Sequence, residues 1–242
     1  MTKEELQAAV DAVPYWYHRI ELPHGIVTPG WAPLDASAYR IPDDLTGKRV
    51  LDVGAWDGYW SIEASRRGAK FVCALENFSD TIGGETNADR QPRWHNLNLC
   101  IDALDIRNVE MIEGDIENVS ESDPPQADVI FCFGVLYHLK NPFQSLENMR
   151  RMCRGTIHIE TAILDGCMSA YGGHGYTGGE TCFEFYPGAE YGRNPSNWWV
   201  GTLRAWCGLV EAAGFTNIES WKLTDKPTTP AETRGFIRAE AA

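Results

Sequence analysis

The stretch DVGAWDGYW at residues 52–60 constrains the fold of this chain more than any other. The apolar run RVL before it is typical of a buried strand, and YWSIEASRRG after the turn has the pattern of a helix that ends at a glycine. Glycines in such a turn let the backbone approach a ligand. Gly54 and Gly58 are present, but Trp56 stands where a dinucleotide fingerprint has its middle glycine. The turn therefore predicts a nucleotide-like cofactor that lacks a pyrophosphate.

The rest of the chain alternates between strand and helix patterns, which predicts a doubly wound α/β sheet. Apolar runs that we expect to form parallel strands cover residues 49–54, 70–76, 109–115, 127–134 and 155–161. Helical patterns separate them at residues 59–68, 93–105 and 141–153. After a further helix at 200–215, the runs 216–223 and 232–240 predict an antiparallel hairpin. The expected sheet is mostly parallel and seven-stranded.

The length of 242 residues suits one domain, 1–242, with a single core. Residues 3–12 have the apolar spacing of a short helix, and the stretch that follows is rich in Pro, Gly and aromatic residues. A second stretch rich in Gly and Tyr interrupts the alternation after the fifth strand. We therefore expect four parts: an N-terminal helix and lid (1–48), a cofactor-binding core (49–161), a substrate cap insertion (162–199) and a C-terminal helix and hairpin (200–242).

Composition limits the partners. The formal net charge is −13, whereas a protein that grips a phosphate backbone usually has a basic patch, so we expect a small-molecule substrate rather than nucleic acid. No apolar run of about 18 residues occurs, so no membrane span is expected. The N-terminus lacks the basic start of a secretory signal, and the seven scattered cysteines suit reduced thiols. These features predict a cytoplasmic protein, and the many aromatic residues leave a homodimer open.

Acidic residues follow three successive expected strands. Asp52 ends the first, Glu76 the second and Asp115 the third. The parallel strands of such a sheet end at the same edge, where ligands bind. S-adenosylmethionine (SAM) has no phosphate, and its ammonium, ribose and adenine groups each suit an acid at one of these positions. We therefore predict SAM as the cofactor. Further expected cofactor contacts are Gly54, Trp56, Gly58, Asn77, Ile116, Phe133 and Tyr137.

Several motifs together resemble a known family. They are LDVGAWDGYWSIEASRRGA, GVLYHLKNPFQSL, IHIETAILDG and NPSNWWVGTLRAWCGLVEAAGF. The chain resembles the SAM-dependent methyltransferases over roughly residues 45–240, and among them the group of bacterial tRNA wobble-uridine methyltransferases and carboxymethyltransferases. The resemblance implies a Rossmann-like class I methyltransferase fold and SAM binding around the turn. Carboxymethyl transfer needs cationic partners for an extra carboxylate, for which Arg234 is a candidate, and Tyr137 could donate a hydrogen bond to it.

Methyl transfer to oxygen is an in-line displacement that needs a positioned hydroxyl and a proton acceptor. His138 follows the fourth strand and is the predicted general base, with a purely structural histidine as the alternative. Glu160, at the end of the fifth strand, is expected to face the same crevice. A divalent metal such as Mg²⁺, held by Glu160, His138 and either Glu180 or Glu184, stays open as an alternative.

Aromatic and polar residues outside the core are candidates for holding the acceptor. The expected substrate contacts are Tyr17, His18, His174, Tyr176, Trp198 and Arg234. The preferred function is O-methylation of a small polar molecule, such as a saccharide or a natural-product intermediate. The alternatives are a tRNA wobble-uridine methyl- or carboxymethyltransferase and a non-catalytic SAM-binding module. A nicotinamide oxidoreductase fits poorly because of Trp56.

Overall fold

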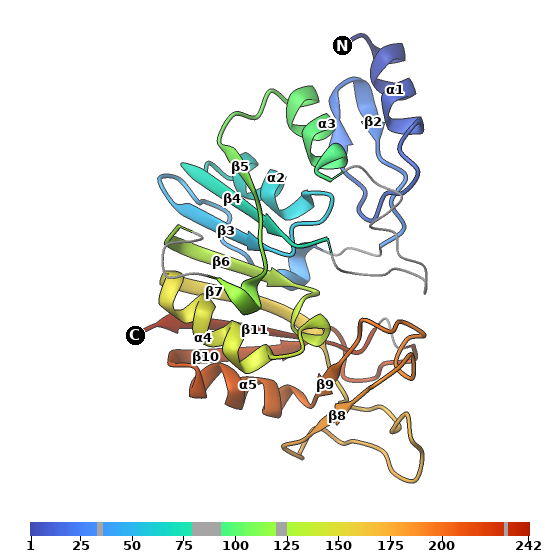
Figure 1. Ribbon diagram of the computed structural model, residues 1–242, viewed down its shortest axis with the longest axis vertical. Coiled ribbons are helices and arrows are strands. Elements are labelled where there is room, and N and C mark those ends of the chain that lie inside the picture. Colours follow the sequence, from blue (N-terminus) through green and yellow to red (C-terminus); the bar gives the residue numbers. More distant parts are fainter. Residues whose placement is uncertain (33–35, 79–92, 120–124, 230–231) are drawn as a thin grey trace.

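The computed structural model describes residues 1–32, 36–78, 93–119, 125–229 and 232–242. One seven-stranded sheet forms its centre (Figure 1). The strands of this sheet are β3 (Arg49–Val53), β4 (Phe71–Glu76), β5 (Val109–Glu113), β6 (Ala127–Phe133), β7 (Cys153–Ala162), β10 (Phe215–Lys222) and β11 (Arg234–Ala241).

The order of strands across the sheet is β10-β11-β7-β6-β3-β4-β5. Strands β5, β4, β3, β6 and β7 pair in parallel, whereas β11 lies between β7 and β10 and is antiparallel to both. The predicted mostly parallel sheet with a C-terminal antiparallel pair is therefore confirmed. Because β3 has β4 on one side and β6 on the other, the strand order reverses at β3, and a crevice for ligands is expected at its carboxyl end.

Helices cover both faces of the sheet, because successive side chains of a strand point to opposite faces. On one face, Val50 of β3 packs in a cluster with Trp60 and Ala64 of α2 (Tyr59–Arg66). On the other face, Leu51 clusters with side chains of α4 (Pro142–Met152) and α5 (Leu203–Ala212). Helices α1 (Lys3–Asp11) and α3 (His95–Ala103) share a third cluster with Ile62 of α2.

The start of α5 differs from the predicted helix at 200–215. Trp199–Gly201 form strand β9, which pairs with β8 (Phe183–Phe185). The helix begins only after Thr202, whose hydroxyl accepts a hydrogen bond from the Ala205 N–H at 3.2 Å. A threonine in this capping position satisfies one of the free N–H groups of the first turn. The sequence pattern missed the boundary because Val200 and Gly201 do not interrupt the apolar spacing.

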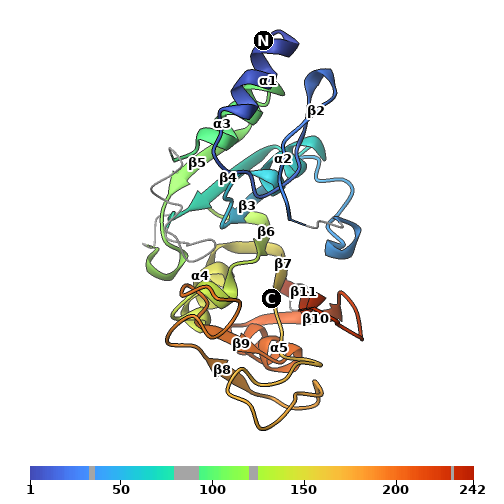
Figure 2. The ribbon, with the colours of Figure 1, turned by 90° about the vertical axis from the view of Figure 1, so that its right-hand side faces the viewer.

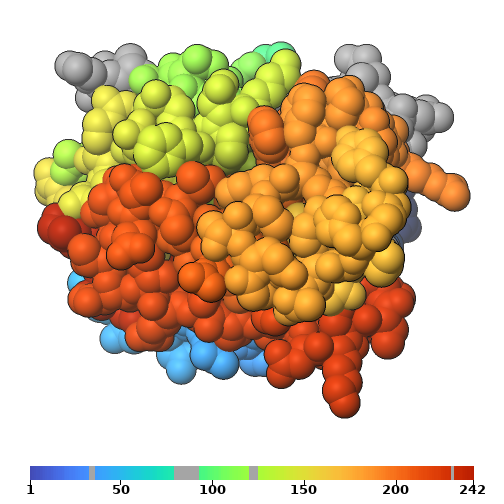
Figure 3. Space-filling view, turned by 90° about the horizontal axis from the view of Figure 1, so that it is seen from below, coloured from blue at the N-terminus to red at the C-terminus, as the bar shows by residue number. Residues whose placement is uncertain are grey.

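Two irregular segments lie near the carboxyl ends of the parallel strands (Figures 1 and 2). The N-terminal segment contains the short pair β1 (Glu21–Leu22) and β2 (Ile26–Val27) and the 3-10 helices η1 (Pro23–Gly25) and η2 (Ala36–Tyr39). The β1–β2 pair lies beside α1 and α3 on the β4–β5 side of the molecule, whereas Tyr39 of η2 packs against Phe133 of β6 and Phe236 of β11. Residues 162–199 lie beside β7 and α5 (Figures 1 and 2). Seen from below, 162–199 and α5 form one continuous surface (Figure 3).

Two further observations concern the cysteines and the helices. All seven cysteines are free thiols. Among the described residues, no helix combines the length and the apolar character that a membrane crossing would need.

Candidate active site

The turn after β3 adopts a left-handed backbone at three positions. The φ angles are +74° at Gly54, +52° at Trp56 and +84° at Gly58. A Cβ atom on Gly54 would lie 2.4 Å from a methyl group of Val135, and one on Gly58 would lie 2.3 Å from Leu97. Both glycines are therefore required by conformation and by space. Trp56 has the backbone of the glycine that it replaces.

Glu76 at the end of β4 ties this turn to the neighbouring strand. Its Oε2 accepts the backbone N–H of Trp56 at 3.0 Å, and its Oε1 accepts those of Asn77 at 2.9 Å and Phe78 at 3.0 Å. The side chain is buried. Asn77 takes part through its backbone N–H. Glu76 thus holds the shape of the turn from the position at which the sequence predicts a contact with ribose.

Asp52 is buried beneath the turn. Its Oδ2 accepts a hydrogen bond from the Ser61 hydroxyl of α2 at 2.6 Å. Burial raises the pKa of Asp52 to about 7, and the bond from Ser61 opposes this shift. Because burial disfavours the charged carboxylate, a nearby cation would stabilise it. The ammonium group of the predicted cofactor is such a cation.

Asp115 and Ile116 lie at the end of β5, beside the end of β4. The Gly114 N–H donates to the Glu76 carbonyl at 3.0 Å, which joins the two strand ends. Asp115 caps the 3-10 helix η4 (Ile116–Asn118), where its Oδ1 accepts the Glu117 N–H at 2.9 Å. Ile116 is buried in the core. Both residues therefore lie at the strand end where the sequence predicts a contact with adenine, and the Asp115 carboxylate is engaged in its own helix cap.

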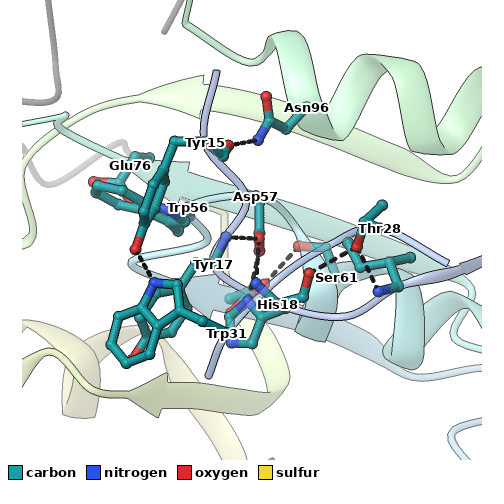
Figure 4. A network of polar contacts seen from close by, with 12 residues as sticks. Tyr15, Tyr17, His18, Thr28, Trp31, Trp56, Asp57, Ser61, Glu76 and Asn96 are labelled. Atoms are coloured by element: carbon teal, nitrogen blue, oxygen red, sulfur yellow. Dashed lines mark hydrogen bonds and ion pairs between the residues drawn. The ribbon is translucent and has the colours of Figure 1, made fainter. Parts of the chain in front are cut away.

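A buried network joins the N-terminal segment to the turn (Figure 4). The side chain of Asp57 is fully buried, and its Oδ2 accepts the backbone N–H groups of Tyr17 at 3.1 Å and His18 at 2.7 Å. The His18 Nδ1 lies 2.5 Å from Asp57 Oδ1. Burial would raise the pKa of Asp57, but His18 and the N–H donors hold it below its ordinary value. His18 thus anchors the segment to the turn through Asp57, and its predicted contact with substrate stays a prediction.

Thr28 and Gly30 complete this network on the side away from the turn. The Thr28 hydroxyl donates to the His18 carbonyl at 2.7 Å and accepts the Ile20 N–H at 2.7 Å. A Cβ on Gly30 would lie 2.1 Å from the backbone of His18, so glycine is required there. The sequence offered one signal for this network, an aspartate next to Gly58 in the turn. Its partner His18 lies too far along the chain for pattern reasoning.

A second cluster forms where β7 meets β11. The Arg234 Nη1 lies 3.3 Å from Glu160 Oε1, and the guanidinium lies over the Tyr137 ring at 5.2 Å from its centroid. Burial raises the pKa of Glu160, and the charge of Arg234 opposes this rise. Burial likewise raises the pKa of Tyr17 to about 12, with Arg234 opposing and Glu160 adding to the shift. Tyr17 therefore lies within electrostatic reach of the pair. We call Glu160, Arg234 and Tyr137 the acid–arginine cluster.

The predicted base His138 lies beside this cluster, in the 3-10 helix η5 (Leu136–His138). Its Nδ1 lies 3.0 Å from the Ser196 hydroxyl and 3.1 Å from the Ser196 carbonyl. The ring of His138 is therefore fixed against residues 162–199, and its role as a base stays a prediction. Phe133, a predicted cofactor contact, packs its ring against Tyr39 and Trp60 at centroid distances of 4.8 and 4.7 Å.

The remaining predicted substrate residues lie in 162–199. The Trp198 N–H donates to the Tyr137 carbonyl at 2.8 Å, which ties this segment to the acid–arginine cluster. The Tyr176 hydroxyl donates to Glu184 at 2.6 Å, and the His174 ring packs against Tyr176 at 4.7 Å. Of the predicted substrate residues, Tyr17 lies within electrostatic reach of Arg234, and the backbone of Trp198 is tied to that of Tyr137. The structure places His174 and Tyr176 in a separate polar group around Glu184.

The metal-ligand set considered from the sequence is not assembled. Glu160 faces Arg234, Glu184 accepts from the Tyr176 and Tyr186 hydroxyls at 2.6 Å each, and Glu180 bonds the Thr177 hydroxyl at 3.0 Å. No group of three or more His, Cys, Asp or Glu side chains suited to a metal ion occurs in the part of the chain that the structure describes. The sequence has no compact metal-ligand motif, and among the described residues the fold does not bring these separate side chains together into one.

Comparison with known proteins gives consistent matches. Residues 32–220 match the family described as a methyltransferase domain. A tRNA U34 carboxymethyltransferase of Colwellia psychrerythraea is 26% identical over 177 residues, which cover 72% of this chain and 47% of that protein. One from Helicobacter pylori is 29% identical over 192 residues, which cover 78% of this chain and 64% of that protein. The chain thus spans about half the length of the first of these curated relatives.

A solved structure matches over a larger share of both chains. The N-terminal domain of EvdMO1, crystallised in the presence of SAH (S-adenosylhomocysteine) and D-fucose, gives a TM-score of 0.67 at 20% identity. The match covers 100% of this chain and 98% of that chain. The chain therefore belongs to the methyltransferase domain family and has the fold of the class I SAM-dependent methyltransferases.

Proposed function

We propose that this chain transfers the methyl group of SAM to an oxygen atom of an acceptor bound at the acid–arginine cluster. The observation that best supports this is the turn at the carboxyl end of β3, with left-handed backbone at Gly54, Trp56 and Gly58. Acids follow at the ends of β3, β4 and β5, where a class I fold binds its cofactor. Family membership supports the same assignment.

The residues present fit SAM. Asp52, with a pKa raised to about 7 by burial, suits the cationic ammonium group of the amino-acid end. Glu76 and Asp115 lie at the adjacent strand ends that the ribose and adenine groups would reach. Bound SAM supplies a methyl carbon activated by the positive sulfur, so the chain itself needs to position the acceptor and take up a proton.

Glu160 is the proton acceptor that this geometry favours. It is buried, and burial raises its pKa, so it is a stronger base than an exposed glutamate. Arg234 at 3.3 Å supplies a positive charge that stabilises the carboxylate before the proton arrives. His138 is the alternative base, and its fixed ring lies next to Tyr137 at a centroid distance of 4.2 Å. The lid (1–48) and cap (162–199) would exclude water from this pair.

Two classes of acceptor have support. The curated relatives are named tRNA U34 carboxymethyltransferases, which favours the wobble uridine of tRNA as the acceptor and keeps carboxymethyl transfer as an alternative to methyl transfer. This goes against our expectation from net charge that nucleic acid is not the substrate. A hydroxyl of a small polar molecule, such as a saccharide, is supported by the net charge of −13 and by the D-fucose in whose presence the EvdMO1 domain was crystallised. The named relatives thus support the tRNA acceptor, whereas the acidic composition of the chain supports the small molecule.

Methyl transfer from labelled SAM tests both classes. Unmodified bulk tRNA and a panel of short saccharides, including D-fucose, are offered in parallel at low salt, with a Glu160→Gln variant as the control. Label in either acceptor that disappears with Glu160→Gln supports the proposal, and the labelled acceptor decides the class. Strong SAH binding without label in any acceptor would instead support a SAM-binding module without catalysis.

A further inference from the structure

The backbone of Trp56 is strained, and its backbone contacts do not explain why a tryptophan occupies this position. Its φ of +52° lies in the left-handed region, which a bulky side chain rarely adopts. Its backbone N–H donates to Glu76 Oε2 at 3.0 Å, a bond that glycine would make without strain. Backbone strain of this kind gathers at functional sites. The reason for a tryptophan must therefore lie in its side chain.

The indole N–H of Trp56 is an unsatisfied donor. The Nε1 atom is buried and has no hydrogen-bond partner among the described residues. Most buried side-chain donors in folded proteins are paired, so an unpaired one calls for a specific explanation. Other tryptophans of this chain follow the rule: the indole of Trp206 donates to the Ala162 carbonyl at 3.0 Å, and that of Trp221 to the Ala38 carbonyl at 2.7 Å.

The position of Trp56 indicates what the donor is for. It lies in the turn after β3, where its backbone N–H bonds Glu76 at the end of β4 (Figure 4). This is the place where the proposed function puts SAM. We propose that Trp56 is a cofactor-binding and specificity residue whose indole N–H donates to an oxygen atom of bound SAM. The inference rests on the proposed SAM binding, and it adds the indole N–H of Trp56 as a donor to the bound cofactor.

Two oxygens of the cofactor share this chemistry, a ribose hydroxyl and the carboxylate of the amino-acid end. Isothermal titration of the wild type and of Trp56→Phe with SAH and with 5′-methylthioadenosine separates them, because the second ligand keeps the ribose and lacks the amino acid. The loss of one hydrogen bond predicts about tenfold weaker SAH binding by Trp56→Phe. An equal loss with methylthioadenosine assigns the bond to the ribose. A loss with SAH alone assigns it to the carboxylate.

Trp206→Phe is the matched control. It removes a buried indole N–H that has a partner within the fold, so its thermal stability should fall while its SAH affinity stays that of the wild type. Equal SAH affinity in the wild type and Trp56→Phe would overturn the inference. So would an equal loss of affinity in both variants, because the effect would then come from the fold. If the wild type binds no SAH, the proposed function itself fails.

Discussion

Replacing Asp57 with alanine should detach the N-terminal segment from the cofactor turn. The Asp57 carboxylate accepts bonds at 3.1, 2.7 and 2.5 Å from Tyr17 and His18, and its side chain is fully buried. Its removal leaves two backbone N–H groups and an imidazole without their partner. Each unsatisfied buried group costs about 1–3 kcal/mol, and removing one member of a buried pair costs about 3–5 kcal/mol. Because these costs do not add, we expect the free energy of unfolding to fall by about 3–5 kcal/mol in total.

Urea unfolding at pH 7, followed by tryptophan fluorescence, measures this loss. Asp128→Ala is the control, because Asp128 is only half-buried and accepts one backbone N–H, from Arg49 at 2.8 Å. It should cost about 0.5–1.5 kcal/mol. A loss for Asp57→Ala no larger than that of the control would refute the reasoning.

The same network predicts a pH dependence. The pKa of Asp57 is lowered in the folded protein, so its contribution to stability is present above the ordinary carboxyl pKa of about 3.9. That contribution is lost as the pH falls through the lowered folded-state pKa. The stability difference between the wild type and Asp57→Ala should therefore shrink in acid.

Four further predictions follow from the site. The pKa of Asp52 is raised to about 7 in the folded protein, so its contribution to stability is lost as the pH rises through that value. In thermal melts from pH 4 to 8, the melting temperature of Asp52→Asn should therefore rise relative to that of the wild type as the pH increases. Glu160→Gln should lower kcat by about 10²-fold or more while SAH affinity, measured by titration, changes little. His138→Ala should lower kcat less than Glu160→Gln, and the reverse order would identify His138 as the base. EDTA should leave methyl transfer unchanged, and activity lost to EDTA and restored by Mg²⁺ would show that a metal is required.

The sheet was predictable because its signals are local. Each parallel strand is an apolar run, and Asp52, Glu76 and Asp115 follow such runs directly, so their placement at adjacent strand ends required only the fold class. The turn was readable for the same reason, since Gly54 and Gly58 are required by φ and by space.

The rest depends on contacts between distant parts of the chain. Histidine is a residue type that often binds ligands, so the sequence suggested a substrate contact at His18. Its partner Asp57 lies 39 positions away, and the bond between them anchors the N-terminal segment to the turn. Glu160 and Arg234 meet only because β11 inserts beside β7 and not at the edge of the sheet. Glu184, a possible metal ligand by residue type, is engaged by two tyrosine hydroxyls. In each case the local pattern was compatible with several partners, and tertiary packing chose one.

Titration of the wild-type protein with SAH, and in parallel with NADH, tests the central claim most directly. The account predicts saturable binding of one SAH per chain and no binding of NADH, because the turn with Trp56 is built for a cofactor that lacks a pyrophosphate. Binding of NADH without binding of SAH would contradict it.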